Sequence, residues 1–501
     1  MTNISLIALR IDICIHWQYI KIFILVRRWH IVFKLRFNER CTVPPSPEVI
    51  EEVKRLLDQA KKDNPNLNVY EFLESLGLEP GNPPGKDKPA KLGLISVDEG
   101  TVSVQNIDVP TFRPSGEVNV LCVLCDFPDN KGKTDSKLYT DLIFSEGTFS
   151  TGSVHDYYKT VSKGKINIVG EVTGWHTLPH PYSFYVGKKN GRDGGGYPNN
   201  AKKMVEDAVS ILLSNGSITW DKYDINNDGF IDAFCVVHAG RGAEVIVDEE
   251  ERKKAIWSHK WQTQRMIKVT QNTHVSPYLT VPEDGDCGVW AHELGHLVFG
   301  WPDLYDACPE GDKTAGLGTW CLMASGSYGQ KVGGRRGESP TYPSAWCRAV
   351  MGWSKIRVLE TNEEIQAPSI QNSDEVFIIP IKNRDKEYFM LESRRKTEQD
   401  VGIPGEGLMV YHIDEATRDN CAEGHRSVGV IQADGQRNLE RIGLFGNRGD
   451  DGDPYPGKSN RIFLNSEGFP NTKAYDDTKT NISLENIRWD GKTATFKVEV
   501  Q

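Results

Sequence analysis

A short stretch near the middle of the chain carries side chains that can activate water on a metal ion. It contains the pattern H-E-x-x-H, formed by His292, Glu293 and His296. Two histidines four residues apart lie on one face of a helix, so both imidazoles can bind the same ion. Glu293 can then accept a proton from a water molecule on that ion. These residue types at this spacing predict a zinc hydrolase site.

The flanking residues favour a buried helix that ends soon after the second histidine. Apolar side chains surround the pattern at Val289, Ala291, Leu294, Leu297 and Val298. The pattern breaks at Gly300, and Pro302 excludes further helix. Zinc requires a third protein ligand and one open position for water. Asp303 and Asp306 follow the turn at once and are the nearest hard donors.

A second stretch, at residues 318–328, reads G-T-W-C-L-M-A-S-G-S-Y. A methionine in such a loop usually belongs simply to the hydrophobic core. Because it follows a zinc motif, we interpret Met323 as the methionine of a tight turn beneath the metal. Tyr328, just past this turn, is a candidate donor to the oxyanion formed during peptide hydrolysis, with simple packing as the alternative.

Residues 224–232 place oxygen donors at alternate positions around Gly229, as in a calcium loop. The candidate calcium ligands are Asp224, Asn226, Asp228 and Asp232. The twelfth position, where a complete loop carries a bidentate Glu, is Cys235. We therefore expect a calcium site completed from elsewhere, and the alternative is an Asx-rich turn. The acidic loop at residues 446–453 is either a second calcium site or a solvated loop.

Together these motifs resemble the M6 family of metallopeptidases, the immune inhibitor A type. The resemblance rests on H-E-L-G-H…G-x-P-D-L-Y-D followed by G-T-W-x-L-M-A-S-G-S. Further stretches that resemble the family lie at residues 153–158, 162–165, 224–229, 257–260, 391–394, 405–408, 411–414 and 431–434. The resemblance covers roughly residues 100–500. It implies a secreted zinc endopeptidase with a metzincin-like α/β zincin domain, a mixed sheet and an active-site helix.

The resemblance also implies a ligand set, with one departure from the family pattern. His292, His296 and Asp303 would hold Zn²⁺, with Met323 in the Met-turn and Glu293 as general base. The family pattern is H-E-x-x-H-x-x-G-x-x-D, but here Gly300 and Asp303 each fall one place later. A longer last helical turn would absorb the extra residue.

Composition and charge limit the classes of function. The 501 residues, 38% hydrophobic and 26% charged, predict a soluble globular protein of two or three domains. The net charge is -10, with seven Lys or Arg against two Asp or Glu in residues 1–40, so the remainder is strongly acidic. An acidic body argues against a nucleic-acid partner. We expect a monomer that acts on proteins or peptides and carries bound cations.

The first 92 residues divide into an atypical start and a small helical segment. Residues 1–40 mix apolar and basic side chains without the layout of a signal peptide, and are too interrupted by charge for a spanning helix. A basic membrane anchor and a misassigned start are the alternatives, and membrane contact is expected only here. Residues 41–92 predict a pro-segment, with helices at 47–62 and 70–76 and a linker at 81–89.

Cysteines give few firm assignments. A pro-segment cysteine can cap zinc as a thiolate, and Cys41 is the candidate, with an ordinary thiol or disulfide as the default. Cys122 and Cys125 lie on alternate faces of an apolar strand and are expected in the core. The residues Cys287, Cys308 and Cys321 flank the zinc motif, and one disulfide among them is expected without a specified pairing.

The remaining pattern predicts a catalytic domain at residues 93–360 and a β-rich domain at 361–501. Strands at 118–124, 166–172 and 233–238 alternate with helices at 153–161, where Ser153 is the N-cap, and 201–213. Short alternating strands follow at residues 376–381, 388–391, 407–412, 427–432 and 494–500, which is typical of a β-sandwich-like region.

The sequence as a whole favours a zinc-dependent endopeptidase over two alternatives. One is a catalytically inactive, surface-binding module that keeps the fold, against which the intact Glu293 argues. The other is a zinc hydrolase of another clan with a Glu ligand on a downstream helix, for which no convincing motif is present.

Overall fold

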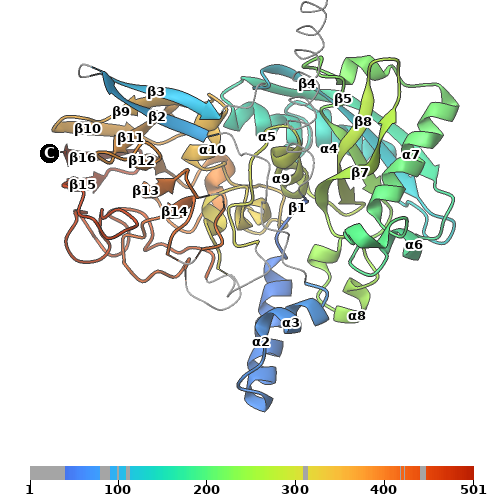
Figure 1. The fold of residues 1–501 in the computed structure, drawn as a ribbon, viewed down its shortest axis with the longest axis horizontal. Helices are drawn as coiled ribbons and strands as arrows, with labels where there is room; N and C mark the ends of the chain where they lie inside the picture. Colours follow the sequence, from blue (N-terminus) through green and yellow to red (C-terminus); the bar gives the residue numbers. More distant parts are fainter. Residues whose placement is uncertain are drawn as a thin grey trace, which may run out of the picture.

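The computed structural model describes residues 40–78, 91–98, 101–108, 113–307, 314–417, 419–422, 424–440 and 447–500. The apolar basic segment, except Arg40, and the linker expected at 81–89 lie outside these residues. Figure 1 shows an α/β lobe and a β-rich lobe with helix α9 (Cys287–Leu297) between them. A small helical segment projects from the junction of the two lobes.

A six-stranded mixed sheet forms the centre of the α/β lobe. Its order is β1 (Cys41–Thr42), β7 (His259–Lys268), β8 (His274–Pro282), β6 (Phe234–His238), β4 (Gly116–Asp126) and β5 (Ile166–Thr177). Strands β5, β4, β6 and β8 run parallel, whereas β7 and β1 are antiparallel to their neighbours. The central strands β4 and β6 read as nearly continuous apolar runs and are buried, as expected for parallel strands covered on both faces.

Alternate residues of β4 enter two separate hydrophobic clusters. Cys122 packs on one face, with α4 (Ser136–Phe144), α5 (Val154–Val161) and α9. Cys125 packs on the other, with α6 (Tyr182–Val186) and α7 (Ala201–Asn215). Both are buried thiols, which confirms their expected place in the core. The expected cap of α5 is also confirmed, because the Ser153 side chain accepts from the Asp156 N–H in a capping box.

The β-rich lobe contains two sheets that share one hydrophobic cluster. The five-stranded sheet has the order β14 (Val428–Val430), β13 (Gly407–Asp414), β12 (Glu387–Arg394), β11 (Glu375–Pro380) and β9 (Lys355–Val358). The three-stranded sheet has the order β10 (Glu363–Pro368), β16 (Thr493–Glu499) and β15 (Ser483–Trp489). Side chains such as Phe377, Phe389 and Phe496 fill the space between them.

Shorter elements complete the described chain. They are the hairpin β2 (Lys91–Asp98) and β3 (Thr101–Asp108), helices α8 (Glu249–Arg252) and α10 (Ala345–Val350), and 3-10 helices η1 (Gly194–Gly196), η2 (Trp220–Tyr223), η3 (Ala243–Val245), η4 (Gly318–Trp320), η5 (Ser325–Tyr328) and η6 (Glu398–Gly402). Cys287 and Cys321 are both buried thiols, so the disulfide expected among Cys287, Cys308 and Cys321 is wrong. Cys421 is disulfide-bonded instead.

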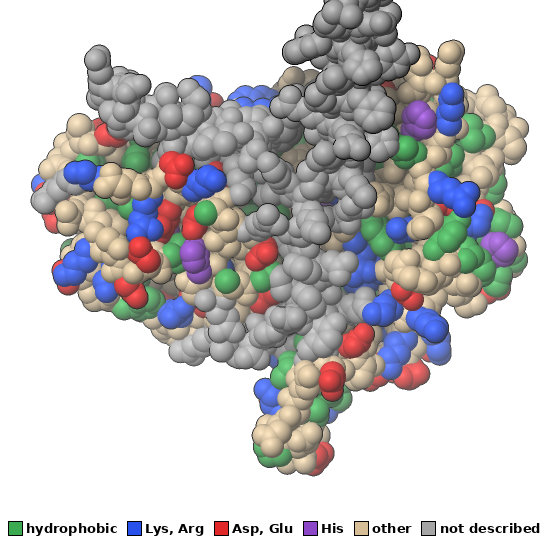
Figure 2. All heavy atoms as spheres, viewed as in Figure 1, with side chains coloured by type: hydrophobic (Ala, Val, Ile, Leu, Met, Phe, Trp, Pro, Cys, Tyr) green, Lys and Arg blue, Asp and Glu red, His purple; other side chains and the backbone are tan. Residues whose placement is uncertain are grey.

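The projecting segment contains helices α2 (Pro47–Asp63) and α3 (Val69–Ser75), close to the ranges expected for a pro-segment. Ser46 caps α2, with Pro47 at the first helical position, where its missing N–H costs nothing. Val49, Ile50 and Val53 are buried at the base of α2, while its far end stands out from the body in Figure 2 with acidic and basic side chains. No helix among the described residues combines the length and apolarity needed to cross a membrane.

Candidate active site

The H-E-x-x-H stretch forms the buried helix α9, and the chain reverses immediately after it. Helix α9 ends at Leu297, and the Val298 N–H donates to the Leu294 carbonyl at 2.9 Å. Gly300 has a φ of 63°, which favours glycine, and the Trp301 N–H returns to the Gly295 carbonyl at 3.1 Å. The extra residue before Gly300 is therefore accommodated in the last turn of the helix.

This reversal brings Asp303 against both histidines. The Nε2 atoms of His292 and His296 lie 3.0 Å apart, and Asp303 Oδ1 lies 3.2 Å and 3.1 Å from them. Four ligands at zinc bond lengths stand about 3.3 Å from one another in a tetrahedron. The three atoms therefore have the spacing of one face of a zinc tetrahedron. The other carboxylate, Asp306, is buried and its N–H donates to the Thr314 carbonyl at 3.4 Å.

Backbone carbonyls fix which nitrogen of each histidine faces Asp303. His292 Nδ1 donates to the Leu322 carbonyl at 3.0 Å, and His296 Nδ1 donates to the Trp301 carbonyl at 2.6 Å. Because a carbonyl only accepts, each Nδ1 carries the proton and each Nε2 of a neutral ring presents a lone pair. Such outer hydrogen bonds orient histidine ligands in metal sites.

The electrostatics of these groups suit a bound cation. Burial lowers the pKa of His296, favouring the neutral ring that binds metals. Burial opposes ionisation of Asp303, but His296 and His292 outweigh it, so the pKa of Asp303 lies below its usual value. Two lone pairs and a carboxylate oxygen thus converge in a buried space, where they repel one another unless a cation or proton lies between them. The donor set fits zinc.

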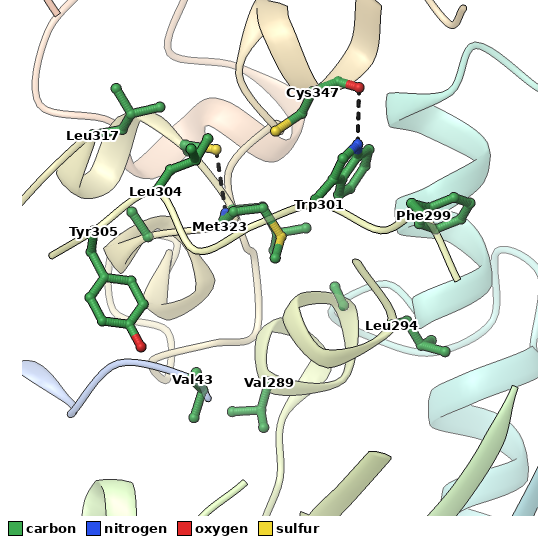
Figure 3. Packing of buried hydrophobic residues seen from close by; sticks show 14 of the residues in the cluster. Val43, Val289, Leu294, Phe299, Trp301, Leu304, Tyr305, Leu317, Met323 and Cys347 are labelled. Atoms are coloured by element: carbon green, nitrogen blue, oxygen red, sulfur yellow. Dashed lines mark hydrogen bonds between the residues drawn. The ribbon is translucent and has the colours of Figure 1, made fainter. Parts of the chain in front are cut away.

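Met323 lies directly beneath the histidine helix. It is fully buried, and its carbonyl accepts from the Leu304 N–H at 2.8 Å. A Cβ at Gly295 would stand 2.7 Å from Met323 Sδ, so a larger residue there would force the Met323 side chain to shift. Figure 3 shows Met323 between α9 and the loop that carries Trp301 and Leu304. The structure therefore places Met323 against α9 at Gly295.

Glu293 lies on the opposite side of the site from this turn, facing the segment before α2. Its Oε1 accepts from the Val43 N–H at 2.9 Å, and Oε2 accepts no hydrogen bond from the described residues. Burial, together with the negative charges of Asp303 and Glu244, raises the pKa of Glu293 well above its usual range.

Residues 40–46 run in extended form across the site. Strand β1 pairs antiparallel with β7, placing Cys41 opposite Lys260 and Thr42 opposite His259. Three successive carbonyls of this segment accept hydrogen bonds from aromatic side chains. The pairs are Tyr305 Oη to Thr42 O at 2.6 Å, Trp257 Nε1 to Val43 O at 2.9 Å, and Tyr328 Oη to Pro44 O at 2.5 Å.

These contacts place one residue from the sequence analysis and add another. Tyr328 is buried and donates to the Pro44 carbonyl. Tyr305 is buried and donates to the Thr42 carbonyl, and Figure 3 shows its hydroxyl directed towards the Val43 segment. Sequence reasoning missed Tyr305 as a candidate, although it stands two residues after Asp303 in the P-D-L-Y-D stretch.

The four candidate calcium ligands lie in one loop that leads into β6. Asp224 accepts from the N–H groups of Asp228 at 3.0 Å and Gly229 at 2.9 Å, and Asp232 accepts from the Ile225 N–H at 2.7 Å. In the second acidic loop, Asp453 accepts from Trp320 Nε1 at 2.8 Å, and burial raises its pKa to about 7.

Glu244, near the site, predicts a specific dependence of stability on pH. Burial raises the pKa of its carboxyl from 4.5 to about 7, although Ser258 donates to it. The folded chain therefore holds this proton more tightly than the unfolded chain, so stability is lost as pH rises from 4.5 through about 7. Urea unfolding should show that the unsubstituted chain loses stability over this pH range while Glu244→Gln does not. The difference in their free energies of unfolding should change by up to about 3 kcal/mol in favour of Glu244→Gln. Parallel curves would contradict this assignment.

Comparison with known proteins gives two matches. Residues 119–354 match the family described as immune inhibitor A peptidase M6, catalytic domain. Immune inhibitor A of Bacillus thuringiensis subsp. alesti is 30% identical over 234 residues, which cover 41% of this chain and 33% of that relative. The chain thus spans about a third of the length of this relative. The family match at residues 119–354 includes the helix, the reversal and the turn just described. These two matches support an M6 family peptidase, with residues 119–354 corresponding to the catalytic domain of that family.

Proposed function

We propose that the protein is a zinc-dependent endopeptidase that hydrolyses protein substrates. One observation carries the proposal: His292 Nε2, His296 Nε2 and Asp303 Oδ1 lie within 3.2 Å of one another. Glu293 lies on α9 between the two histidines. The match of residues 119–354 to the M6 peptidase family supports a peptidase, and the donor set supports zinc as its metal.

The roles of the side chains follow from their positions. A zinc ion held by His292, His296 and Asp303 would lower the pKa of a bound water and polarise the scissile carbonyl. Glu293, whose Oε2 accepts no hydrogen bond from the described chain, takes the proton of the attacking water and returns it to the leaving amine. Met323 supports α9 from below through Gly295.

The hydrogen bonds to residues 42–44 indicate how a substrate main chain would bind. The donors Tyr305, Trp257 and Tyr328 contact carbonyl oxygens and not side chains of the bound segment. An extended peptide that pairs with the edge of a sheet is held in the same way, and main-chain recognition tolerates varied sequences. Tyr305 and Tyr328 are also candidate donors to the oxyanion. An extended cleft of this kind suits an endopeptidase.

We also propose an extracellular location for the protein, which the family resemblance implies. Cys421 is disulfide-bonded, and disulfides persist mainly in oxidising compartments. We propose a monomeric enzyme whose partners are its protein substrates.

Removal and return of the metal test the proposed activity. Because residues 40–46 cross the site, casein hydrolysis is measured on the full chain before and after limited trypsin treatment, with trypsin then blocked by a serine-protease inhibitor. We expect hydrolysis that a zinc chelator abolishes and added zinc restores. A trypsin-treated chain that binds one zinc ion yet cleaves neither casein nor a peptide library would favour the inactive binding module.

We propose calcium as a structural ion at the loop of Asp224, Asn226, Asp228 and Asp232. Calcium at about 100 times its dissociation constant would stabilise the fold by roughly 2.7 kcal/mol. This corresponds to a rise of roughly 5–10 °C in the melting temperature. Calorimetry after EGTA treatment, with calcium or magnesium added back, should show the rise with calcium alone and not in Asp228→Asn. An equal melting temperature with and without calcium would leave the loop as an Asx-rich turn.

A further inference from the structure

The sulfur of Cys41 lies beside the proposed zinc ligands. The ligand atoms of Cys41, His296 and Asp303 all lie within 4.8 Å of one another, and all three residues are buried. Cys41 is a thiol in this structure and lies more than 240 residues before the histidines in sequence. The three protein ligands proposed for zinc leave one tetrahedral position, and a thiolate is a strong zinc ligand.

The main chain around Cys41 holds its side chain at this place. Cys41 and Thr42 pair with β7. Hydrogen bonds with Glu293, Tyr305, Trp257 and Tyr328 fix the main chain of residues 42–44. The Ser46 N–H then donates to the Glu244 carbonyl at 2.8 Å, immediately before α2 begins. The segment thus uses the donors and the strand edge that a substrate main chain would use, and its Val43 N–H engages the carboxylate proposed as general base.

Val43 shows that the segment is also packed and not only hydrogen-bonded. Its side chain is fully buried in the same hydrophobic cluster as Val289 and Tyr305. Figure 3 shows Val43 between these two side chains. Water and substrate therefore cannot reach Glu293 while residues 40–46 remain in place.

We propose that the Cys41 thiolate is the fourth protein ligand of the metal ion in the intact chain, so that residues 40–46 keep the peptidase inactive. The inference rests on the proposed zinc site. The thiol gives its proton to solvent when its sulfur binds the ion. Withdrawal of the segment breaks the metal–sulfur bond, returns a proton to the thiolate and opens the position to water. Activation requires only that this segment leave the cleft.

Cobalt in place of zinc provides a direct test, because a thiolate bound to Co²⁺ gives a near-ultraviolet charge-transfer band. The full chain, Cys41→Ser and the control Cys287→Ser are loaded with Co²⁺, and both metal content and absorption are measured. Cys287 is a buried thiol at the start of the same helix α9. We expect one ion per chain in all three proteins, with the band in the unsubstituted chain and Cys287→Ser and its loss in Cys41→Ser.

Activity gives a second readout on the same proteins. Without trypsin treatment, Cys41→Ser loaded with zinc should hydrolyse peptides about tenfold or more faster than the unsubstituted chain, because an intramolecular competitor has lost its metal bond. One bound cobalt without the thiolate band in the unsubstituted chain would overturn the inference and leave the proposed function intact. Failure of all three proteins to bind cobalt would contradict the metal site itself, and this inference with it.

Discussion

Glu293→Gln should lower kcat for peptide hydrolysis by about 100- to 10,000-fold in the trypsin-treated chain. Glutamine keeps the size of the side chain and can still accept the Val43 N–H, but it cannot take a proton from water. The amide nitrogen that replaces Oε2 occupies the same buried position near Asp303. Zinc binding should not change, because Glu293 is not among the three converging donor atoms. The measurement is steady-state hydrolysis of a fluorogenic peptide together with zinc content.

Glu244→Gln is the matched control for this result. Glu244 is another buried glutamate near the cleft, held by Ser258. Its substitution removes a carboxylate from the same region without removing a group that faces the substrate. We expect near-normal kcat at neutral pH for this variant. Equal losses in both variants, or activity retained in Glu293→Gln, would remove Glu293 from its role as general base.

Asp303→Asn should weaken zinc binding by more than the roughly 10- to 100-fold that loss of an outer-sphere partner typically costs. The substitution keeps the shape of the side chain but removes the anionic oxygen that lies 3.2 Å and 3.1 Å from the two histidine nitrogens. The remaining two neutral imidazoles, even with the thiolate proposed for Cys41, lack one anionic ligand of the complete set. Competition with a chromogenic chelator measures the affinity.

Asp306→Asn tests which of the two carboxylates that follow α9 binds zinc. Asp306 is buried three residues later and its N–H pairs with Thr314. Zinc affinity should be close to that of the unsubstituted chain in this variant. The reverse result, with Asp306→Asn losing zinc and Asp303→Asn retaining it, would mean that the one-residue shift in the motif moves the third ligand.

Local patterning predicted the helix that positions the site. The apolar spacing around His292 and the break at Gly300 predict a buried helix with a sharp end, and α9 spans Cys287–Leu297. Gly300 and Asp303 each fall one place later than in the family pattern. The positive φ of Gly300 and the hydrogen bond from the Trp301 N–H to the Gly295 carbonyl accommodate the longer turn.

One strand of the β-rich lobe is longer than the sequence predicts, because its last residues are charged. Strand β12 was expected at residues 388–391 but runs over Glu387–Arg394. Its last residues are charged yet fully buried, because Glu392 pairs with Arg348, and Arg394 Nη2 lies 2.6 Å from Asp400 Oδ1. A buried ion-pair network of this kind has no apolar alternation to detect.

Long-range contacts account for what else was missed. The sequence predicted a helical pro-segment and raised Cys41 as a zinc cap, but gave no reason for residues 40–46 to pair with β7, more than 200 residues away. Nor does spacing show that Tyr305 donates to Thr42. Periodicity reports the face of an element and not its distant partner, so such contacts emerge only from the folded chain.

Diffraction from crystals of the zinc-loaded full chain, measured on both sides of the zinc absorption edge, tests the central claim most directly. The account predicts one strong anomalous peak bonded to His292 Nε2, His296 Nε2 and an oxygen of Asp303, at roughly 2.0–2.2 Å from each. A zinc peak that lacks any of these three ligands, or that is completed by a glutamate from elsewhere in the chain, would contradict it.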